Sequence, residues 1–157
     1  MKKSLAHTVW ECKYHIVWVP KNRRKIAYGR LQREIGKVLR KLCEYKGIEV
    51  LDGAACADHI HIFLSIPPKY AVSTIVGYLK GKSTMILFER YSSLRRNFRG
   101  HSFWARGYYV STVGLDEQKV RKYIKNQQEH ETIKDRYDTD LEKDPFRGAS
   151  KIGEEDN

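Results

Sequence analysis

Apolar residues alternate with polar ones in several stretches of the chain, and each stretch predicts a β-strand. In residues 58–67, D-H-I-H-I-F-L-S-I-P, every second position is apolar. Successive side chains of a strand point to opposite faces, so the apolar set would line a buried face. That set is Ile60, Ile62, Leu64 and Ile66. Further strands are predicted in residues 8–19, 48–57 and 103–113.

Helical patterns lie between and after these strands. Residues 28–45 and 71–90 carry apolar residues at helical spacing, and Gly47 signals the end of the first helix. Asp116 stands where an N-cap is expected, ahead of a helix over 117–130. The order predicts an α+β fold. Its topology is ferredoxin-like (RRM-like), β-α-β-β-α-β with an antiparallel sheet and an added C-terminal helix.

The length and composition are those of one domain. A chain of 157 residues with 41% hydrophobic residues can form one core, which we place in residues 1–135. Residues 136–157 form an acidic, polar tail whose composition is typical of disorder. The chain has no membrane-length apolar run and no signal-peptide pattern at its N-terminus. The cysteines are odd in number and widely spaced, so we expect reduced thiols and a cytoplasmic location.

Charge is unevenly distributed along the chain. Residues 1–130 contain 25 Lys and Arg against 10 Asp and Glu, whereas residues 131–157 contain 5 against 9. The folded part is therefore more basic than the formal net charge of +11 suggests. A basic domain favours a polyanionic partner. Nucleic acid is preferred to a membrane, because the chain lacks a basic amphipathic helix with bulky apolar anchors.

Two histidines occupy the other face of the 58–67 strand. His59 and His61 are one residue apart, at the start of the strand and opposite in parity to the apolar row. Neutral imidazoles in this arrangement can occupy two adjacent positions on a divalent cation, which then needs further ligands. A structural role is the alternative, and the pair alone does not decide between the two.

Tyr123 and Gln127 offer further donors. They are four residues apart on the last predicted helix, so they lie on one face, flanked by Val120 and Ile124. Tyr123 could simply be a core aromatic residue of that stripe. A glutamine beside it is awkward in a core, because its amide needs hydrogen-bond partners. A cation held by the histidines would give the Gln127 oxygen a partner and bring a phosphate next to the Tyr123 hydroxyl.

The segment 77–83, G-Y-L-K-G-K-S, is similar to a phosphate-binding P-loop but has the wrong spacing. Three residues separate its glycines where the motif requires four, and the segment lies inside a predicted helix. We therefore expect no nucleotide cofactor. Lys80 and Lys82 would then either contact DNA phosphates or belong to a solvated helix face.

Several blocks of sequence, in this order, resemble the single-tyrosine HUH-endonuclease transposases of small prokaryotic insertion sequences. HUH denotes His, a bulky apolar residue and His. The resemblance runs from His7 to Gln128, and all catalytic positions match. The blocks are Y-H-I-V-W-V-P-K-N-R-R-K, D-H-I-H-I-F-L-S-I-P-P-K, V-S-T-I-V-G-Y-L-K-G-K-S-T, F-W-A-R-G-Y-Y-V-S-T-V-G and V-R-K-Y-I-K-N-Q-Q.

This resemblance implies a DNA transposase that cuts and rejoins single-stranded DNA. Tyr123 would be the catalytic nucleophile, leaving a free 3′-hydroxyl and a 5′-phosphotyrosine intermediate. His59, His61 and Gln127 would hold one Mg²⁺ or Mn²⁺ that polarises the scissile phosphate. The covalent step conserves the phosphodiester energy, so rejoining needs no nucleotide.

The implied partners are single-stranded DNA with a hairpin near the element ends and a second copy of the chain, with no membrane partner. In related homodimers the tyrosine helix of one subunit can complete the metal site of the other. Tyr123 and Gln127 would then act in trans to the histidines. Contacts to the DNA backbone are expected from Lys21, Arg23, Arg24, Lys25, Lys80, Lys82, Arg95, Arg96 and Arg99.

Two other functions are compatible with the same residues. A domesticated relative would process repeated palindromic sequences dispersed in a chromosome. A non-catalytic RRM-like module would bind nucleic acid without cleavage or metal, but this leaves Gln127 beside Tyr123 unexplained.

Overall fold

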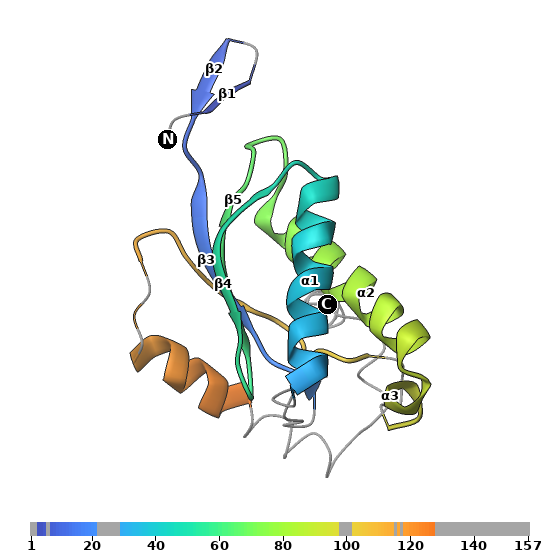
Figure 1. The fold of residues 1–157 in the computed structure, drawn as a ribbon. Coiled ribbons are helices and arrows are strands. Elements are labelled where there is room, and N and C mark those ends of the chain that lie inside the picture. Colours follow the sequence, from blue (N-terminus) through green and yellow to red (C-terminus); the bar gives the residue numbers. More distant parts are fainter. Residues whose placement is uncertain are drawn as a thin grey trace, which may run out of the picture.

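A four-stranded antiparallel sheet forms the centre of the fold (Figure 1). The structure is a computed structural model, and it describes residues 3–5, 7–21, 29–97, 102–114, 116 and 118–127. The sheet contains β3 (Lys13–Trp18), β4 (Glu49–Ala55), β5 (Ile60–Ser65) and β6 (Tyr109–Ser111). The helices are α1 (Gly29–Tyr45), α2 (Val72–Arg90), α3 (Ser92–Asn97) and an unlabelled helix of residues 118–127.

The spatial order of the strands is β4-β5-β3-β6, and each pairs antiparallel to its neighbours. The first and third strands of the β-α-β-β-α-β unit, β3 and β5, are thus the central pair. This order confirms the predicted ferredoxin-like α+β fold. The helix of residues 118–127 is the added C-terminal element.

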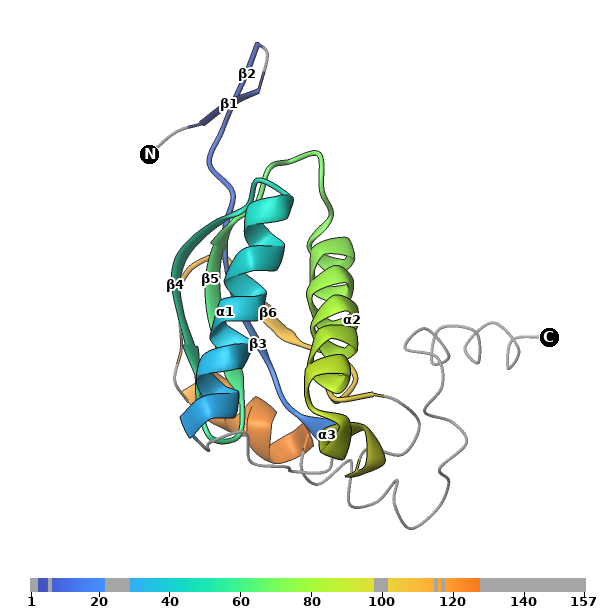
Figure 2. The ribbon, with the colours of Figure 1, turned by 45° about the vertical axis from the view of Figure 1, so that its right-hand side comes forward.

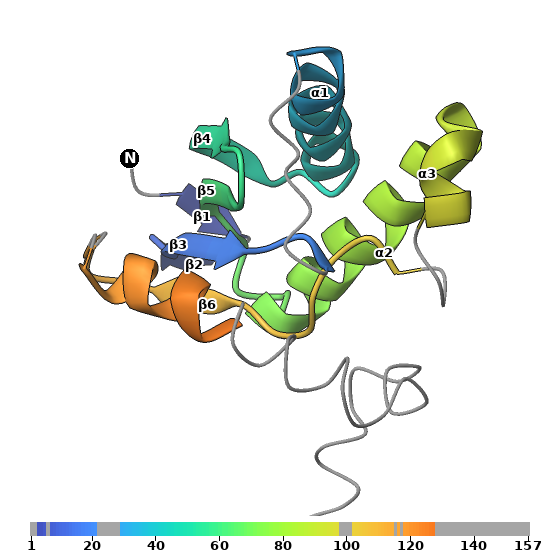
Figure 3. The same cartoon turned by 90° about the horizontal axis from the view of Figure 1, so that it is seen from below.

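The helices lie in two layers on opposite sides of the sheet. α1 and α2 cover one face, and the 118–127 helix lies against the other (Figures 2 and 3). The larger core joins α1 and α2 to β3 and β5. A smaller core lies under the 118–127 helix, formed by Val17, Val19, Ala105, Val120 and Ile124.

The alternating row of β5 is buried as predicted. Ile60, Ile62, Leu64 and Ile66 belong to the larger core, facing α1 and α2. The opposite parity of β5 therefore faces the layer of the 118–127 helix. The predicted helices also form, with Ile35, Val38, Leu39 and Leu42 of α1 and Ile75, Val76 and Leu79 of α2 buried.

Two predicted strands are shorter than expected. Within residues 8–19, β2 (Thr8–Trp10) instead pairs with β1 (Lys3–Leu5) in a hairpin that projects from the sheet (Figure 1). The ladder between β3 and β5 stops after Ile66, whose N–H donates to the Cys12 carbonyl oxygen at 2.9 Å. Hydrogen-bonded pairs alternate along an antiparallel ladder, so the next donor on this strand would be residue 68, which is Pro68 and has no N–H.

Within residues 103–113, only Tyr109–Ser111 forms a strand, and Trp104 makes an isolated bridge to Pro20. Between them Gly107 has a φ of +79°, which turns the chain out of an extended conformation. The predicted tail, residues 136–157, lies outside the described residues. No helix among the described ranges is long and apolar enough to cross a membrane.

Candidate active site

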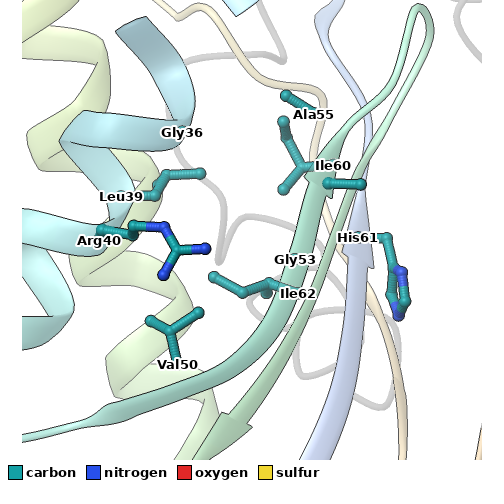
Figure 4. Close-up of a pocket in the computed structure, with 10 residues that line it drawn as sticks. Gly36, Leu39, Arg40, Val50, Gly53, Ala55, Ile60, His61 and Ile62 are labelled. Atoms are coloured by element: carbon teal, nitrogen blue, oxygen red, sulfur yellow. The ribbon is translucent and has the colours of Figure 1, made fainter. Parts of the chain in front are cut away.

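His61 lies in the middle of the sheet, on the face away from α1 and α2. In the strand pairing, Ala54 of β4, His61 of β5, Val17 of β3 and Tyr109 of β6 are successive neighbours, so all four share one face. A pocket of about 120 Å³ lies between α1 and strands β4 and β5. The His61 ring points away from α1 and from this pocket (Figure 4).

His59 lies just before β5 and has the same parity as His61. Its Nδ1 is 2.8 Å from the Asp58 carboxylate oxygen. A carboxylate on one imidazole nitrogen orients the ring and leaves Nε2 available to a metal ion, which is a common arrangement for ligating histidines. Both predicted histidines are thus half-buried on one face, with one of them fixed by a carboxylate.

A third histidine, from β3, contacts this pair. His15 Nδ1 lies 3.5 Å from His61 Nε2, and the His15 ring stacks on Phe63 with centroids 4.1 Å apart. Burial lowers the pKa of His61, His15 and His59 lower it further, and Asp52 opposes them. A lowered pKa favours the neutral form of His61, the form in which an imidazole binds a metal ion.

Tyr123 is held on the same side of the sheet by its helix. The Asp116 carboxylate accepts hydrogen bonds from the backbone N–H groups of Gln118 and Lys119, at 3.0 and 3.3 Å, which confirms the predicted N-cap. Val120 and Ile124 then pack on the sheet as part of the smaller core. The Tyr123 hydroxyl is buried, and its ring centroid lies 6.2 Å from that of Tyr109.

Gln127 is one turn beyond Tyr123 and lies beside the bend at Gly107. A Cβ placed on Gly107 would be 3.8 Å from Gln127 Nε2, an ordinary van der Waals contact. The predicted amide therefore lies on the same side of the sheet as the phenol. It approaches the backbone that leads into β6.

The structure places the histidine pair and the tyrosine helix on one face of the sheet, but at some distance from each other. Tyr109, the ring neighbour of Tyr123, belongs to β6, and His61 belongs to β5, with β3 between them. Two strand spacings amount to roughly 10 Å. Within the described ranges, no group of three or more His, Cys, Asp or Glu side chains could hold a metal ion.

The predicted DNA contacts have very different surroundings. Lys21 is only 7% exposed, whereas Lys82 is exposed on α2. Lys80 is not on a solvated face, because its Nζ donates to the carbonyl oxygens of Ala105 and Gly107 at 2.7 and 3.0 Å. Side chains outside the described part are those of Arg23, Arg24, Lys25, Arg95, Arg96 and Arg99. DNA contact stays a prediction for the whole set.

The segment 77–83 is helical, as predicted, and lies within α2. Its Ser83 hydroxyl is fully buried and accepts a hydrogen bond from Trp104 Nε1 at 2.9 Å. It also donates to the Lys80 carbonyl oxygen at 3.1 Å. The hydroxyl that would bind Mg²⁺ in a true P-loop is therefore engaged within the core.

His15 and Asp58 were not assigned roles from the sequence. Asp58 directly precedes His59, so its position in D-H-I-H was an available signal. His15 could be placed on a strand face by its parity. Its contact with His61 depends on the register between β3 and β5, which parity does not reveal.

Comparisons with known proteins agree with this architecture. A protein-family model described as "Transposase IS200 like" matches residues 8–127. The transposase for insertion sequence element IS200 of Salmonella typhimurium is 49% identical over 147 residues, covering 94% of this chain and 97% of the relative.

Solved structures point the same way. A crystal structure described as a transposase from Deinococcus radiodurans superposes with a TM-score of 0.73 at 26% identity, covering 81% of this chain and 98% of that one. A REP-associated tyrosine transposase bound to a REP hairpin superposes with a TM-score of 0.50 at 12% identity, covering 83% of this chain and 74% of that one. At this identity the match shows similarity of fold alone. The chain belongs to the family of IS200-like transposases.

Proposed function

We propose that this transposase cuts and rejoins single-stranded DNA at insertion-sequence ends through a 5′-phosphotyrosine intermediate on Tyr123. The observation that carries the proposal is the shared face. The helix with Tyr123 packs over Val17, and Val17 is the direct neighbour of His61 on the adjacent strand. A phenol and two imidazoles thus border one surface of a basic protein whose family transposes DNA.

In the proposed reaction the Tyr123 hydroxyl gives up its proton and its oxygen attacks the scissile phosphorus. The bond from phosphorus to the 3′-oxygen breaks, and the leaving oxygen takes up a proton to become a free 3′-hydroxyl. Attack by another 3′-hydroxyl reverses the process and releases the phenol. Each step exchanges one phosphodiester for another, so no nucleotide cofactor is required.

One Mg²⁺ or Mn²⁺ ion is part of the proposal. His59 and His61 would supply two nitrogens and Gln127 an amide oxygen, and Asp58 on His59 is the kind of support that ligating histidines have. Such an ion would bind and polarise the scissile phosphate. His15 against His61 holds the second ring in place on the same face.

A homodimer with shared sites is part of the proposal. Tyr123 packs beside Tyr109, on the β6 side of β3, whereas His61 lies on the β5 side. A tyrosine helix supplied by a second copy would close this spacing. Mixing a Tyr123→Phe chain with a His61→Ala chain should then restore the DNA cleavage that neither variant performs alone. If the mixture stays inactive, action in trans is wrong.

Hairpins near the element ends are the proposed DNA target. One protein of similar fold is bound to a REP hairpin, and the excess of basic residues in 1–130 suits such a ligand. The IS200 relative favours an insertion-sequence role over the processing of dispersed palindromes.

The deciding experiment looks for a covalent adduct. Wild-type protein is incubated with single-stranded element ends and Mn²⁺ and then run on a denaturing gel. Tyr123→Phe should abolish the adduct, while Tyr109→Phe, whose ring is 6.2 Å away, serves as the matched control and should retain it. EDTA should also abolish it. Binding without any wild-type adduct would instead support a non-catalytic module.

A further inference from the structure

A lysine of α2 fixes the bend between Trp104 and β6. Lys80 of α2 donates to the carbonyl oxygens on both sides of Arg106, those of Ala105 and Gly107. Gly107 adopts its φ of +79° at this bend. Two hydrogen bonds from one ammonium group fix the backbone of residues 105–107, and so the position from which the Arg106 side chain starts.

Two guanidinium nitrogens of Arg106 are buried. These are Nε and Nη2, and among the residues that the structure describes they have no hydrogen-bond partner. Nor does any carboxylate of those residues pair with Arg106 or Lys80. Burial without a partner is unfavourable for a charged donor, so such groups in native proteins call for a ligand or an ordered water. Burial also lowers the pKa of Lys80 to about 8.

The bend lies next to the tyrosine helix. Ala105 packs in the smaller core together with Val120 and Ile124, and Tyr123 packs against that core. Gly107 lies beside the Gln127 amide. The residues on both sides of Arg106 therefore lie against the helix that carries the proposed nucleophile.

We propose that Arg106 binds a phosphate of the DNA strand beside the cleavage point, and that Lys80 is a positioning residue that holds its bend. This inference rests on the proposed function. A guanidinium presents paired N–H donors that match two phosphate oxygens, which an ammonium group cannot do. The phosphate would satisfy the buried donors and neutralise a bend that contains two cations.

A binding experiment tests Arg106 without requiring cleavage. Affinity for a single-stranded oligonucleotide is measured against salt in a Tyr123→Phe protein. Arg106→Gln should weaken binding about tenfold and reduce the salt slope by about one, whereas Arg106→Lys should keep the slope and lose part of the affinity. Arg33→Gln, exposed on α1 on the opposite face, is the matched control. Unchanged affinity and slope for Arg106→Gln would mean that water satisfies the buried nitrogens.

A measurement on the unsubstituted arginine covers the case in which Arg106 variants fail to fold. In the same protein, the Arg106 Nε–H resonance should shift when the oligonucleotide is added, and the Arg33 resonance should not. A signal that does not move would overturn the proposal. Because neither readout needs chemistry, an Arg106 effect without a wild-type adduct would count against the proposed function alone.

Lys80 is tested by its coupling to Arg106. If Lys80 only positions the bend, Lys80→Met should itself lower the affinity for the oligonucleotide, and adding Arg106→Gln should then lower it little further. Lys80→Arg should restore part of the affinity that Lys80→Met loses. Lys82→Met, two residues away and exposed, should leave the Arg106 effect intact. Additive effects of Lys80→Met and Arg106→Gln would contradict a positioning role.

Discussion

His15 and His61, from neighbouring strands, stack with ring centroids 5.7 Å apart and planes inclined by 15°. His15 is itself stacked on Phe63 at 1°. His61 thus has a defined ring orientation before any ion binds. The neighbour that provides it lies 46 residues away in the chain.

Replacing His15 should therefore weaken metal binding. His15→Phe keeps a ring to stack on Phe63 but removes the nitrogen that lies 3.5 Å from His61. Loss of a group that supports a metal ligand typically lowers metal affinity about 10- to 100-fold. Mn²⁺ affinity measured by electron paramagnetic resonance checks this, with exposed His7→Gln as the control. Equal affinities would show that the His15 nitrogen has no part in metal binding.

Asp58 should matter for the other ligand. Asp58→Asn replaces the carboxylate that lies 2.8 Å from His59 Nδ1 with a neutral amide, so the ring loses its charged support. We expect Mn²⁺ affinity to fall by about tenfold with little change in stability. Glu44→Gln, exposed on α1, controls for the loss of one negative charge. A loss of the same size in both variants would count against a specific role.

The N-cap should govern the tyrosine helix. Asp116→Ala removes the acceptor for two backbone N–H groups and should lower the free energy of unfolding by about 1 kcal/mol. Asp116→Asn can still cap and should retain most of it. Hydrogen exchange checks the local effect, since amides of residues 118–124 should exchange faster in Asp116→Ala. Unaltered exchange there would show that packing alone holds the helix.

Lys80 should make stability depend on alkaline pH. Its pKa is about 8 in the folded protein against an ordinary value of 10.5. Between these values the unfolded chain binds the proton and the folded one does not, so the free energy of unfolding rises with pH. The free energy of unfolding is measured by denaturation for wild type and for Lys80→Met. The value for wild type minus that for the variant should increase from pH 8 to 10.5. A flat difference would show that the folded pKa is not lowered.

Periodicity in the chain was sufficient to predict most of the fold. The alternation at 58–67 identified the buried row of β5, because strand side chains have a fixed period of two. Helical spacing identified α1, α2 and the helix of Tyr123, with Asp116 at its start. The bend at Gly107 could not be predicted in this way, because glycine adopts either sign of φ and the sequence does not say which sign it takes here.

The sequence by itself therefore determined the kinds and order of elements, the shared face of His59 and His61, and the helix that carries Tyr123 with Gln127. Only the tertiary structure decided that this helix covers the histidine face and that His15 stacks on His61. It also decided that Lys80 turns inward to the backbone beside Arg106. The reason is physical: side-chain periodicity is a local property of the backbone, whereas contacts between distant segments depend on strand register and on which surfaces pack together.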